Sequence, residues 1–174
     1  MAFILETERL TLRELEQPDY PALCKILQDP EVMYAYGRAF DDAETQEWLD
    51  RQLERYRETG VGLWAADLKE AGEMIGLCGL IVQDCDGERV LEIGYFLQKA
   101  HWHRGYAIEA AMACKRYAFD VLGTREVCSI IREDNLASQN VARRNGMTLR
   151  KRYIKQHGYN VGMPHLVFSI KAKE

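Results

Sequence analysis

Apolar and polar positions along the chain follow two periods, one typical of strands and one typical of helices. Seven short segments alternate or are continuously apolar, and turn residues separate them. These predicted strands cover residues 9–15, 61–68, 74–83, 90–97, 126–131, 147–154 and 164–170. Because Gly72 and Gly87 lie in the breaks between residues 61 and 97, we expect an antiparallel meander there. The last two strands should form a hairpin across residues 155–162.

Four segments have helical spacing instead. The predicted helices cover residues 18–28, 42–59, 104–122 and 136–145. Asp41 or Asp42 is placed to cap the second helix and Asn135 the fourth, while Gly146 suits a left-handed stop. An apolar stripe on the second helix, expected in the core, consists of Trp48, Leu49, Leu53 and Tyr56. A stripe of small residues that lets the third helix lie close on a sheet consists of Ala107, Ala110, Ala111, Cys114, Ala118 and Val121.

The order of these elements predicts one mixed α/β domain over residues 1–174, with a mostly antiparallel sheet and helices on its faces. No linker, repeat or low-complexity tract divides the chain. A chain of 174 residues can bury about 70% of the surface that it exposes when unfolded. The fold therefore needs no disulfide or metal to hold it together.

Composition and charge narrow the class of protein. Hydrophobic residues make up 47% and charged residues 29%, which is typical of soluble globular proteins. A net charge of −4 gives no general attraction for nucleic acids or anionic membranes. Five cysteines without a Cys-x-x-Cys pair are typical of reduced thiols in the cytosol. No stretch reaches the ~20 apolar residues of a membrane span, and Met-Ala-Phe-Ile-Leu-Glu is too short and acidic for a secretion signal. We expect a cytoplasmic monomer or homodimer.

The strongest chemical signal lies between Glu92 and Leu122. An apolar run, Ile93 to Leu97, leads through a short loop into the third helix, whose first turn is expected to carry Arg104, Gly105 and Ala107. The first N–H groups of a helix lack partners inside it, and the helix dipole adds a partial positive charge there. Small residues keep these amides accessible, and the arginine adds a charged donor. The pattern favours a phosphate site, although glycine near a helix start also serves packing alone.

Other motifs point away from alternative classes. His101 and His103 alternate, but further ligands at a recognisable spacing are missing, so we expect no metal. The nucleotide-binding pattern Gly-x-x-x-x-Gly-Lys-[Ser/Thr] does not occur. A basic cluster favours a solvated face, or a secondary attraction for cofactor phosphate, over an RNA site. The cluster consists of Arg143, Arg144, Arg150, Lys151 and Arg152.

Four blocks occur in order over nearly the whole chain. They are Thr7-Glu8-Arg9-Leu10-x-Leu12-Arg13 with Asp19, Asp29-Pro30-Glu31-Val32-Met33, Glu92-Ile93-Gly94-Tyr95 with Trp102-x-Arg104-Gly105-Tyr106-Ala107-x-Glu109-Ala110, and Asn135-x-x-Ser138-x-x-Val141-x-x-Arg144-x-Gly146-Met147. Together they resemble the Gcn5-related N-acetyltransferases, in particular the branch that acetylates the N-terminal amino group of ribosomal proteins. The departures from that branch are His103 for glycine, Lys99 for proline and Ile108 for threonine.

The resemblance implies the acyl-CoA N-acyltransferase fold, a splayed sheet in which two parallel neighbours part and acetyl-CoA lies in the gap. It also implies that the main chain of Leu97 pairs with the pantetheine arm and that Asn135 binds this arm from the opposite side. The amides that would hold the pyrophosphate are those of His103, Arg104, Gly105 and Ala107.

The implied reaction is attack of a neutral primary amine on the thioester carbonyl. An α-amine with a pKa near ~7.7–8.0 is substantially free at pH 7, whereas a lysine-like amine near ~10.4 needs a base. Glu92 is the candidate base, Ser138 matches the hydroxyl that protonates the departing thiolate, and the N–H of Leu97 is a candidate donor to the carbonyl oxygen. The residues leave simpler roles open: a solvated strand carboxylate for Glu92, a locally bonded hydroxyl for Ser138 and a helix-dipole role for Glu109.

The sequence does not select the acceptor, which can be a peptide N-terminus, a polyamine or another small-molecule amine. We expect its site to be shaped by Tyr34 to Phe40, the second helix and the hairpin from Lys155 to Gly162, with His157 and Tyr159. The alternative from another class is a non-catalytic module that binds or senses acyl-CoA. Loss of both Ser138 and a usable carboxylate would favour that alternative, and both are present.

Overall fold

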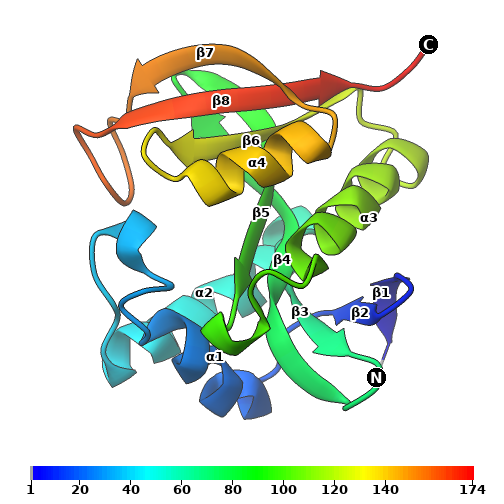
Figure 1. The fold of residues 1–174 in the computed structure, drawn as a ribbon, viewed down its shortest axis with the longest axis vertical. Helices are drawn as coiled ribbons and strands as arrows, with labels where there is room; N and C mark the ends of the chain where they lie inside the picture. Colours follow the sequence, from blue (N-terminus) through cyan, green and yellow to red (C-terminus); the bar gives the residue numbers. More distant parts are fainter. Residues whose placement is uncertain (1) are drawn as a thin grey trace.

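The computed structural model describes residues 2–174, which contain eight β-strands and four α-helices (Figure 1). The strands are β1 (Phe3–Glu6), β2 (Leu10–Arg13), β3 (Leu63–Leu68), β4 (Glu73–Cys85), β5 (Glu88–Leu97), β6 (Glu126–Arg132), β7 (Thr148–Ile154) and β8 (Pro164–Lys171). The helices are α1 (Tyr20–Leu27), α2 (Asp42–Thr59), α3 (Tyr106–Asp120) and α4 (Leu136–Arg144). Short 3-10 helices cover Gln17–Asp19, Tyr34–Tyr36 and Lys99–His101. Over the described residues, every helix is too short or too polar to cross a bilayer.

All predicted strands and helices are present, but β1 was not predicted. It forms an edge of the sheet and pairs antiparallel with β2. Four residues are too few to show a period, and their side chains are only half-buried or exposed. β1 is extended because it pairs with β2, and its own sequence does not indicate this pairing.

The third helix begins at Tyr106 rather than at Arg104, which corrects the prediction. Gly105 has a φ of +81° and occupies the position before the first helical residue, so Arg104 and Gly105 belong to the preceding loop. Val121 follows the helix and is 65% exposed, so it is not part of the packed stripe. The stripe residues that are buried are Ala110, Ala111, Cys114 and Ala118.

All eight strands form one sheet in the order β1-β2-β3-β4-β5-β6-β8-β7. The predicted meander (β3, β4, β5) and the predicted hairpin (β7, β8) are confirmed. β5 and β6 are the parallel neighbours, and within residues 2–174 they pair at one register position, Glu92 opposite Cys128. By contrast, β4 and β5 stay paired along their length. The sheet is therefore splayed between β5 and β6, as the resemblance implied.

Helices cover both faces of the sheet (Figure 1). On one face, Cys114 Sγ of α3 lies 3.6 Å from Cys78 Sγ of β4. Tyr95, the cross-strand neighbour of Cys78, donates its hydroxyl to the carbonyl of Ser138 in α4 at 2.8 Å. Because side chains alternate along a strand, Phe96 points to the other face, where α1 packs on α2. α3 and α4 thus lie on one face, and α1 and α2 on the other.

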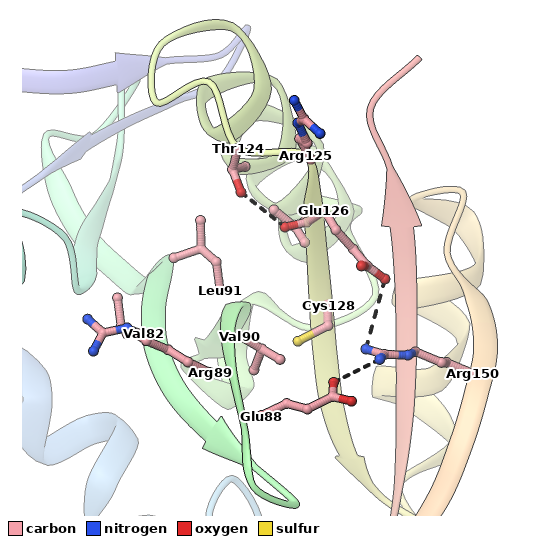
Figure 2. A pocket seen from close by; sticks show the side chains of 11 residues that line it. Val82, Glu88, Arg89, Val90, Leu91, Thr124, Arg125, Glu126, Cys128 and Arg150 are labelled. Atoms are coloured by element: carbon pink, nitrogen blue, oxygen red, sulfur yellow. Dashed lines mark hydrogen bonds and ion pairs between the residues drawn. The ribbon is translucent and has the colours of Figure 1, made fainter. Parts of the chain in front are cut away.

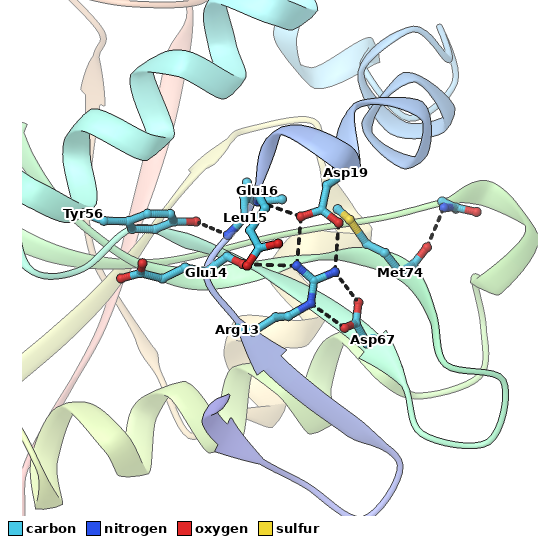
Figure 3. A network of polar contacts seen from close by, with 9 residues as sticks. Arg13, Glu14, Leu15, Glu16, Asp19, Tyr56, Asp67 and Met74 are labelled. Atoms are coloured by element: carbon cyan, nitrogen blue, oxygen red, sulfur yellow. Dashed lines mark hydrogen bonds and ion pairs between the residues drawn. The ribbon is translucent and has the colours of Figure 1, made fainter. Parts of the chain in front are cut away.

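A buried ion cluster fixes the chain between β2 and α1 (Figure 3). Arg13, which is 6% exposed, places its Nη2 2.8 Å from Asp19 Oδ1 and its Nε 2.7 Å from Asp67 Oδ2. It also donates to the carbonyl of Glu14 at 3.1 Å. The cluster joins β2, the 3-10 turn and β3, which explains why Arg13 and Asp19 both belong to the first sequence block.

The sheet also opens on the other side of the Glu92–Cys128 pair. A cavity of about 410 Å³ lies between the amino ends of β5 and β6 (Figure 2). Arg150 of β7 crosses it, with Nη2 2.8 Å from Glu88 Oε2 and Nη1 4.0 Å from Glu126 Oε1. Ion pairs therefore bridge the two strands where their main chains are apart.

Candidate active site

A larger cavity, of about 1050 Å³, lies where the carboxyl ends of β5 and β6 separate. Its walls come from these two strands, the starts of α3 and α4, one side of α2 and the loop between β7 and β8. The predicted site residues that line it are Glu92, Leu97, His103, Gly105, Ala107, Asn135 and Ser138. Arg104 is the predicted site residue that does not line it, and its side chain is exposed.

The main chain of β5 faces the gap at alternate residues. Ser129 Oγ of β6 donates to the carbonyl of Ile93 at 2.9 Å, and Trp102 Nε1 donates to the carbonyl of Leu97 at 3.1 Å. The amide of Gln98 instead donates to a carbonyl of β4 at 2.9 Å. Because main-chain groups of successive strand residues point in opposite directions, the Leu97 amide faces the gap. Because the Leu97 carbonyl already accepts a hydrogen bond from Trp102, the Leu97 amide is the main-chain group of this residue that is left for a ligand.

The loop before α3 presents a row of unused hydrogen-bond donors. Within residues 2–174, the amides of residues 103–107 donate to no protein atom, and the next main-chain bond runs from Glu109 N to Gly105 O at 3.1 Å. His103 and Gly105 are both left-handed, with φ of +60° and +81°. Such residues turn neighbouring amides to one side and form anion-binding concavities, here at the positive end of a 15-residue helix. The left-handed backbone at His103 is a conformation that suits glycine, the residue that the resemblance implied at this position.

Arg9 and Glu109 hold this loop from behind. The Arg9 Nε lies 2.7 Å from Glu109 Oε2, Arg9 Nη1 donates to the carbonyl of Arg104 at 3.0 Å, and the guanidinium lies 4.3 Å from the centre of the Tyr106 ring. Glu109 Oε1 also accepts from the Thr7 hydroxyl at 2.6 Å and from the Arg9 amide at 2.8 Å. Burial raises the pKa of Glu109, but these hydrogen bonds outweigh it and lower the pKa below its ordinary value. Glu109 therefore does more than complement the helix dipole, and sequence analysis missed the part played by Arg9.

Ser138 and Asn135 lie on the α4 side of the gap. Asn135 Oδ1 accepts from the Ser138 amide at 3.2 Å and so caps α4, as predicted. The Ser138 carbonyl accepts from Tyr95, whereas the Ser138 hydroxyl has no hydrogen-bond partner among residues 2–174. The simpler role, a hydroxyl bonded to local backbone, does not match this geometry. The hydroxyl is free to meet a ligand in the cavity.

Glu92 enters the cavity from the opposite face of the sheet. It lies on the same face as Phe96, four residues along β5. Burial raises the pKa of Glu92 from an ordinary value of 4.5 to about 7, and the nearby Lys155 and Arg55 partly offset that rise. A carboxyl group with this pKa exchanges protons near neutral pH, unlike an ordinary solvated strand glutamate. It is suited to accept a proton from an amine.

Aromatic side chains form one wall of the cavity near Glu92. The ring of Tyr36 lies 5.2 Å from Phe96 and 4.8 Å from Tyr159, and Phe40 lies 5.7 Å from Tyr159. The side-chain amide of Asn160 also donates to the carbonyl of the residue before Tyr36. The loop after α1 and the loop between β7 and β8 therefore meet, and their role in shaping the acceptor site stays a prediction.

Three residues of the basic cluster at residues 143–152 form ion pairs with different acidic residues. Its ion pairs are Arg150–Glu88 at 2.8 Å, Lys151–Asp86 at 3.3 Å and Arg152–Glu133 at 2.7 Å. Arg144 lines the cavity instead, so it can add positive charge near a bound phosphate. In the part of the chain that the structure describes, no three His, Cys, Asp or Glu side chains gather in a way that could hold a metal ion.

Known proteins resemble this chain over most of its length. Residues 9–148 match the family model described as an acetyltransferase (GNAT) domain. The uncharacterized protein YkkB of Bacillus subtilis is 38% identical over 152 residues, which cover 84% of this chain and 88% of that protein. The crystal structure of an acetyltransferase from Agrobacterium tumefaciens is 32% identical, covers 97% of this chain and 94% of its own, and superimposes with a TM-score of 0.81. A structure of the ribosomal L7/L12 α-N-protein acetyltransferase RimL in complex with coenzyme A shares the fold, with a TM-score of 0.78, 98% of each chain covered and 19% identity.

Proposed function

This chain belongs to the GNAT acetyltransferase family, and we propose that it transfers the acetyl group of acetyl-CoA to a primary amine. The observation that carries the proposal is the row of unused amides at residues 103–107, beside the cavity where β5 and β6 part. Membership of an enzyme family favours catalysis over a non-catalytic acyl-CoA module. A cytoplasmic location is part of the proposal, since the cysteines are all free thiols.

The site fits a cofactor with a pyrophosphate at one end and a thioester at the other. The amides of His103, Arg104, Gly105 and Ala107 would hold the pyrophosphate, because a helix N-terminus offers both hydrogen bonds and a favourable field. From there the cavity extends along β5, so the pantetheine arm would lie along this strand and bring its thioester to the Leu97 amide. The Asn135 side chain lines the opposite wall, although its oxygen is already used as the helix cap.

Bound acetyl-CoA supplies an acetyl group activated as a thioester. The Leu97 amide would donate to the carbonyl oxygen as negative charge develops there, since this N–H points into the gap at the open end of β5. Trp102 holds the Leu97 carbonyl, which lies in the next peptide group along the chain, and so helps to fix the backbone of Leu97. Trp102 thereby acts as a positioning residue.

Glu92 would take the proton that the amine must lose. A pKa of about 7 lets its carboxylate form at physiological pH while keeping it basic enough to accept a proton, directly or through one water. Ser138 would donate its hydroxyl proton to the departing sulfur and recover one from solvent. The C–N bond forms as the C–S bond breaks, and the amine proton remains on Glu92 until solvent removes it.

The two faces of the sheet separate the two substrates in this proposal. Ser138 and the phosphate loop lie on the face covered by α3 and α4, while Glu92 and the aromatic wall lie on the face covered by α1 and α2. The thioester would cross the sheet through the gap between β5 and β6. The amine would approach from the other side.

A thiol-release assay tests the proposal. Purified protein and acetyl-CoA are incubated with peptides, polyamines and amino compounds, and free CoA thiol and acetylated product are measured together. We expect release that depends on the amine and matches the product mole for mole. Binding of CoA without transfer to any amine would support the non-catalytic alternative.

A further inference from the structure

Two cations near Glu92 lack ion-pair partners. Arg55 of α2 and Lys155, which follows β7, both line the cavity and are half-buried. Within residues 2–174, neither side chain makes a hydrogen bond or an ion pair, and the contacts of both residues involve their main chain. Half-buried charges are normally paired, because removing a charge from water is costly.

The acidic groups of the cavity do not balance these cations. Glu31 is paired with Lys99 at 2.6 Å, and Asp84 is an exposed side chain that accepts from the Gly87 amide at 3.3 Å. Glu92 is near both cations, since each lowers its pKa, but among the described residues it forms an ion pair with neither and is partly protonated at neutral pH. The acceptor end therefore carries excess positive charge.

A third cation extends the same region. Arg51 lies one helical turn before Arg55 on α2 and lines the cavity. Its Nη2 lies 3.4 Å from the hydroxyl of Tyr159, and its Nη1 lies 4.0 Å from Glu47 Oε2 at the exposed side of the helix. Tyr159 in turn packs against Tyr36 in the aromatic wall. Positive charge and an aromatic surface thus lie next to each other, beside the candidate base.

We propose that the acceptor is an amine that also carries a carboxylate, with Arg55 and Lys155 binding the carboxylate and the aromatic wall covering the apolar part of the molecule. The inference rests on the proposed acetyl transfer. An arginine fork and a lysine ammonium are the side chains best suited to a carboxylate. The same cations disfavour polyamines, because like charges would be brought together in a partly desolvated site.

A simpler role for the cations would be to keep the carboxyl of Glu92 ionisable. In that case the loss of either cation would lower the acetylation rate of every acceptor equally and shift the pH at which activity appears. If the cations bind a carboxylate, their loss would lower the acetylation rate only of acceptors that carry a carboxylate. Paired acceptors therefore separate the two roles.

The test compares matched amines: phenylalanine with 2-phenylethylamine, tryptophan with tryptamine, and leucine with 3-methylbutylamine. Thiol release gives kcat/KM for each, corrected for the fraction of unprotonated amine. We expect the carboxylate member of a pair to be favoured about ten-fold or more, as a charge-assisted contact allows. In Arg55→Met and Lys155→Met this preference should fall toward one, and Arg55→Lys should restore part of it.

The control is Arg57→Met, an exposed arginine of the same helix that lies outside the cavity, and it should keep the preference. If Arg55→Met and Lys155→Met lower kcat/KM equally for both members of a pair, the inference is overturned. A wild-type protein that prefers the amines without a carboxylate would overturn it as well. Turnover only of spermidine, or only of peptides with an amidated C-terminus and no acidic side chain, would overturn it and leave acetyl transfer intact. Failure of the proposed transfer would instead appear as no release with any amine.

Discussion

Arg9 and Glu109, a hundred residues apart, form an ion pair of 2.7 Å, and Arg9 also binds the carbonyl of Arg104 at 3.0 Å. These contacts connect the turn before β2 to the loop whose amides are free. The pair lies behind the loop and outside the set of residues that line the cavity. Its role in the proposed site is therefore to hold the phosphate loop in shape.

Breaking this pair should weaken acetyl-CoA binding more than it slows the chemistry. In Glu109→Gln we expect the KM for acetyl-CoA to rise roughly ten-fold, with kcat within about two-fold, because the loop loses its fixed geometry. Steady-state kinetics with acetyl-CoA as the varied substrate measure both. Glu88→Gln removes an ion pair of 2.8 Å with Arg150, two residues that do not line the candidate active site, and should change neither. A fall in kcat at constant KM would argue against a positioning role.

The pH dependence of turnover should follow Glu92. Since its pKa is about 7 and the carboxylate is the basic form, kcat should rise with pH up to about 7 and then level off. Glu92→Gln should lower kcat by ~10²–10⁴ and remove this limb of the profile. A wild-type limb that persists in the variant would assign the titration to another group.

The same raised pKa affects stability, with a definite sign. Between pH 4.5 and about 7 the unfolded chain has lost the Glu92 proton while the folded protein keeps it, so the contribution of Glu92 to stability falls as pH rises. Glu92→Gln should therefore gain stability relative to the wild type as pH increases through this range. Urea unfolding at pH 4.5 and pH 8 measures the difference, and a constant difference would indicate that Glu92 is not desolvated.

Ser138→Ala should lower kcat far more than the affinity for CoA. The hydroxyl makes no hydrogen bond within the described residues, so its removal leaves the fold intact. Single-turnover acetyl transfer, with CoA affinity measured by calorimetry, separates the two effects. An unaltered rate would remove the acid role from Ser138 and leave direct protonation by water.

Arg13→Met should destabilise the fold without touching the site. The substitution leaves Asp19 and Asp67 without their shared cation in a partly buried position, a change that typically costs about 3–5 kcal/mol. Chemical denaturation of Arg13→Met should show a lower midpoint at an unchanged slope. The control, Arg57→Met, should have a midpoint close to that of the wild type. A midpoint of Arg13→Met equal to that of the wild type would mean that the cluster is solvated in solution.

Local pattern was sufficient for most of the fold. The apolar runs of β3 to β5 and the capped ends of α2 and α4 are properties of neighbouring residues, so they are visible in the sequence. β1 was missed because an edge strand of four residues has too little pattern. The start of α3 was placed two residues early because spacing does not reveal that Gly105 is left-handed.

The sequence indicated the site only in part, because local pattern does not reveal contacts between distant residues. The motifs located the residues that line the gap, but the contacts that orient them join distant segments. Ser129 meets Ile93 only after β5 and β6 have been placed side by side, and Arg9 meets Glu109 only after β2 has been placed beside α3. Arg55 is one of several charged residues on α2, and no spacing rule distinguishes it from exposed neighbours such as Arg57. Register and tertiary packing supply that information.

Calorimetric titration of CoA tests most directly whether free amides at residues 103–107 hold a pyrophosphate. Wild-type protein should bind one CoA per chain and bind it far more tightly than pantetheine, which lacks the pyrophosphate. Gly105→Glu should weaken CoA binding about a hundred-fold or more, since it places a negative charge and a strained side chain at the amides. Gly123→Glu, at another left-handed glycine with open space around it, should bind like the wild type. Equal affinities for CoA and pantetheine, or unchanged CoA affinity in a folded Gly105→Glu protein, would contradict the phosphate site.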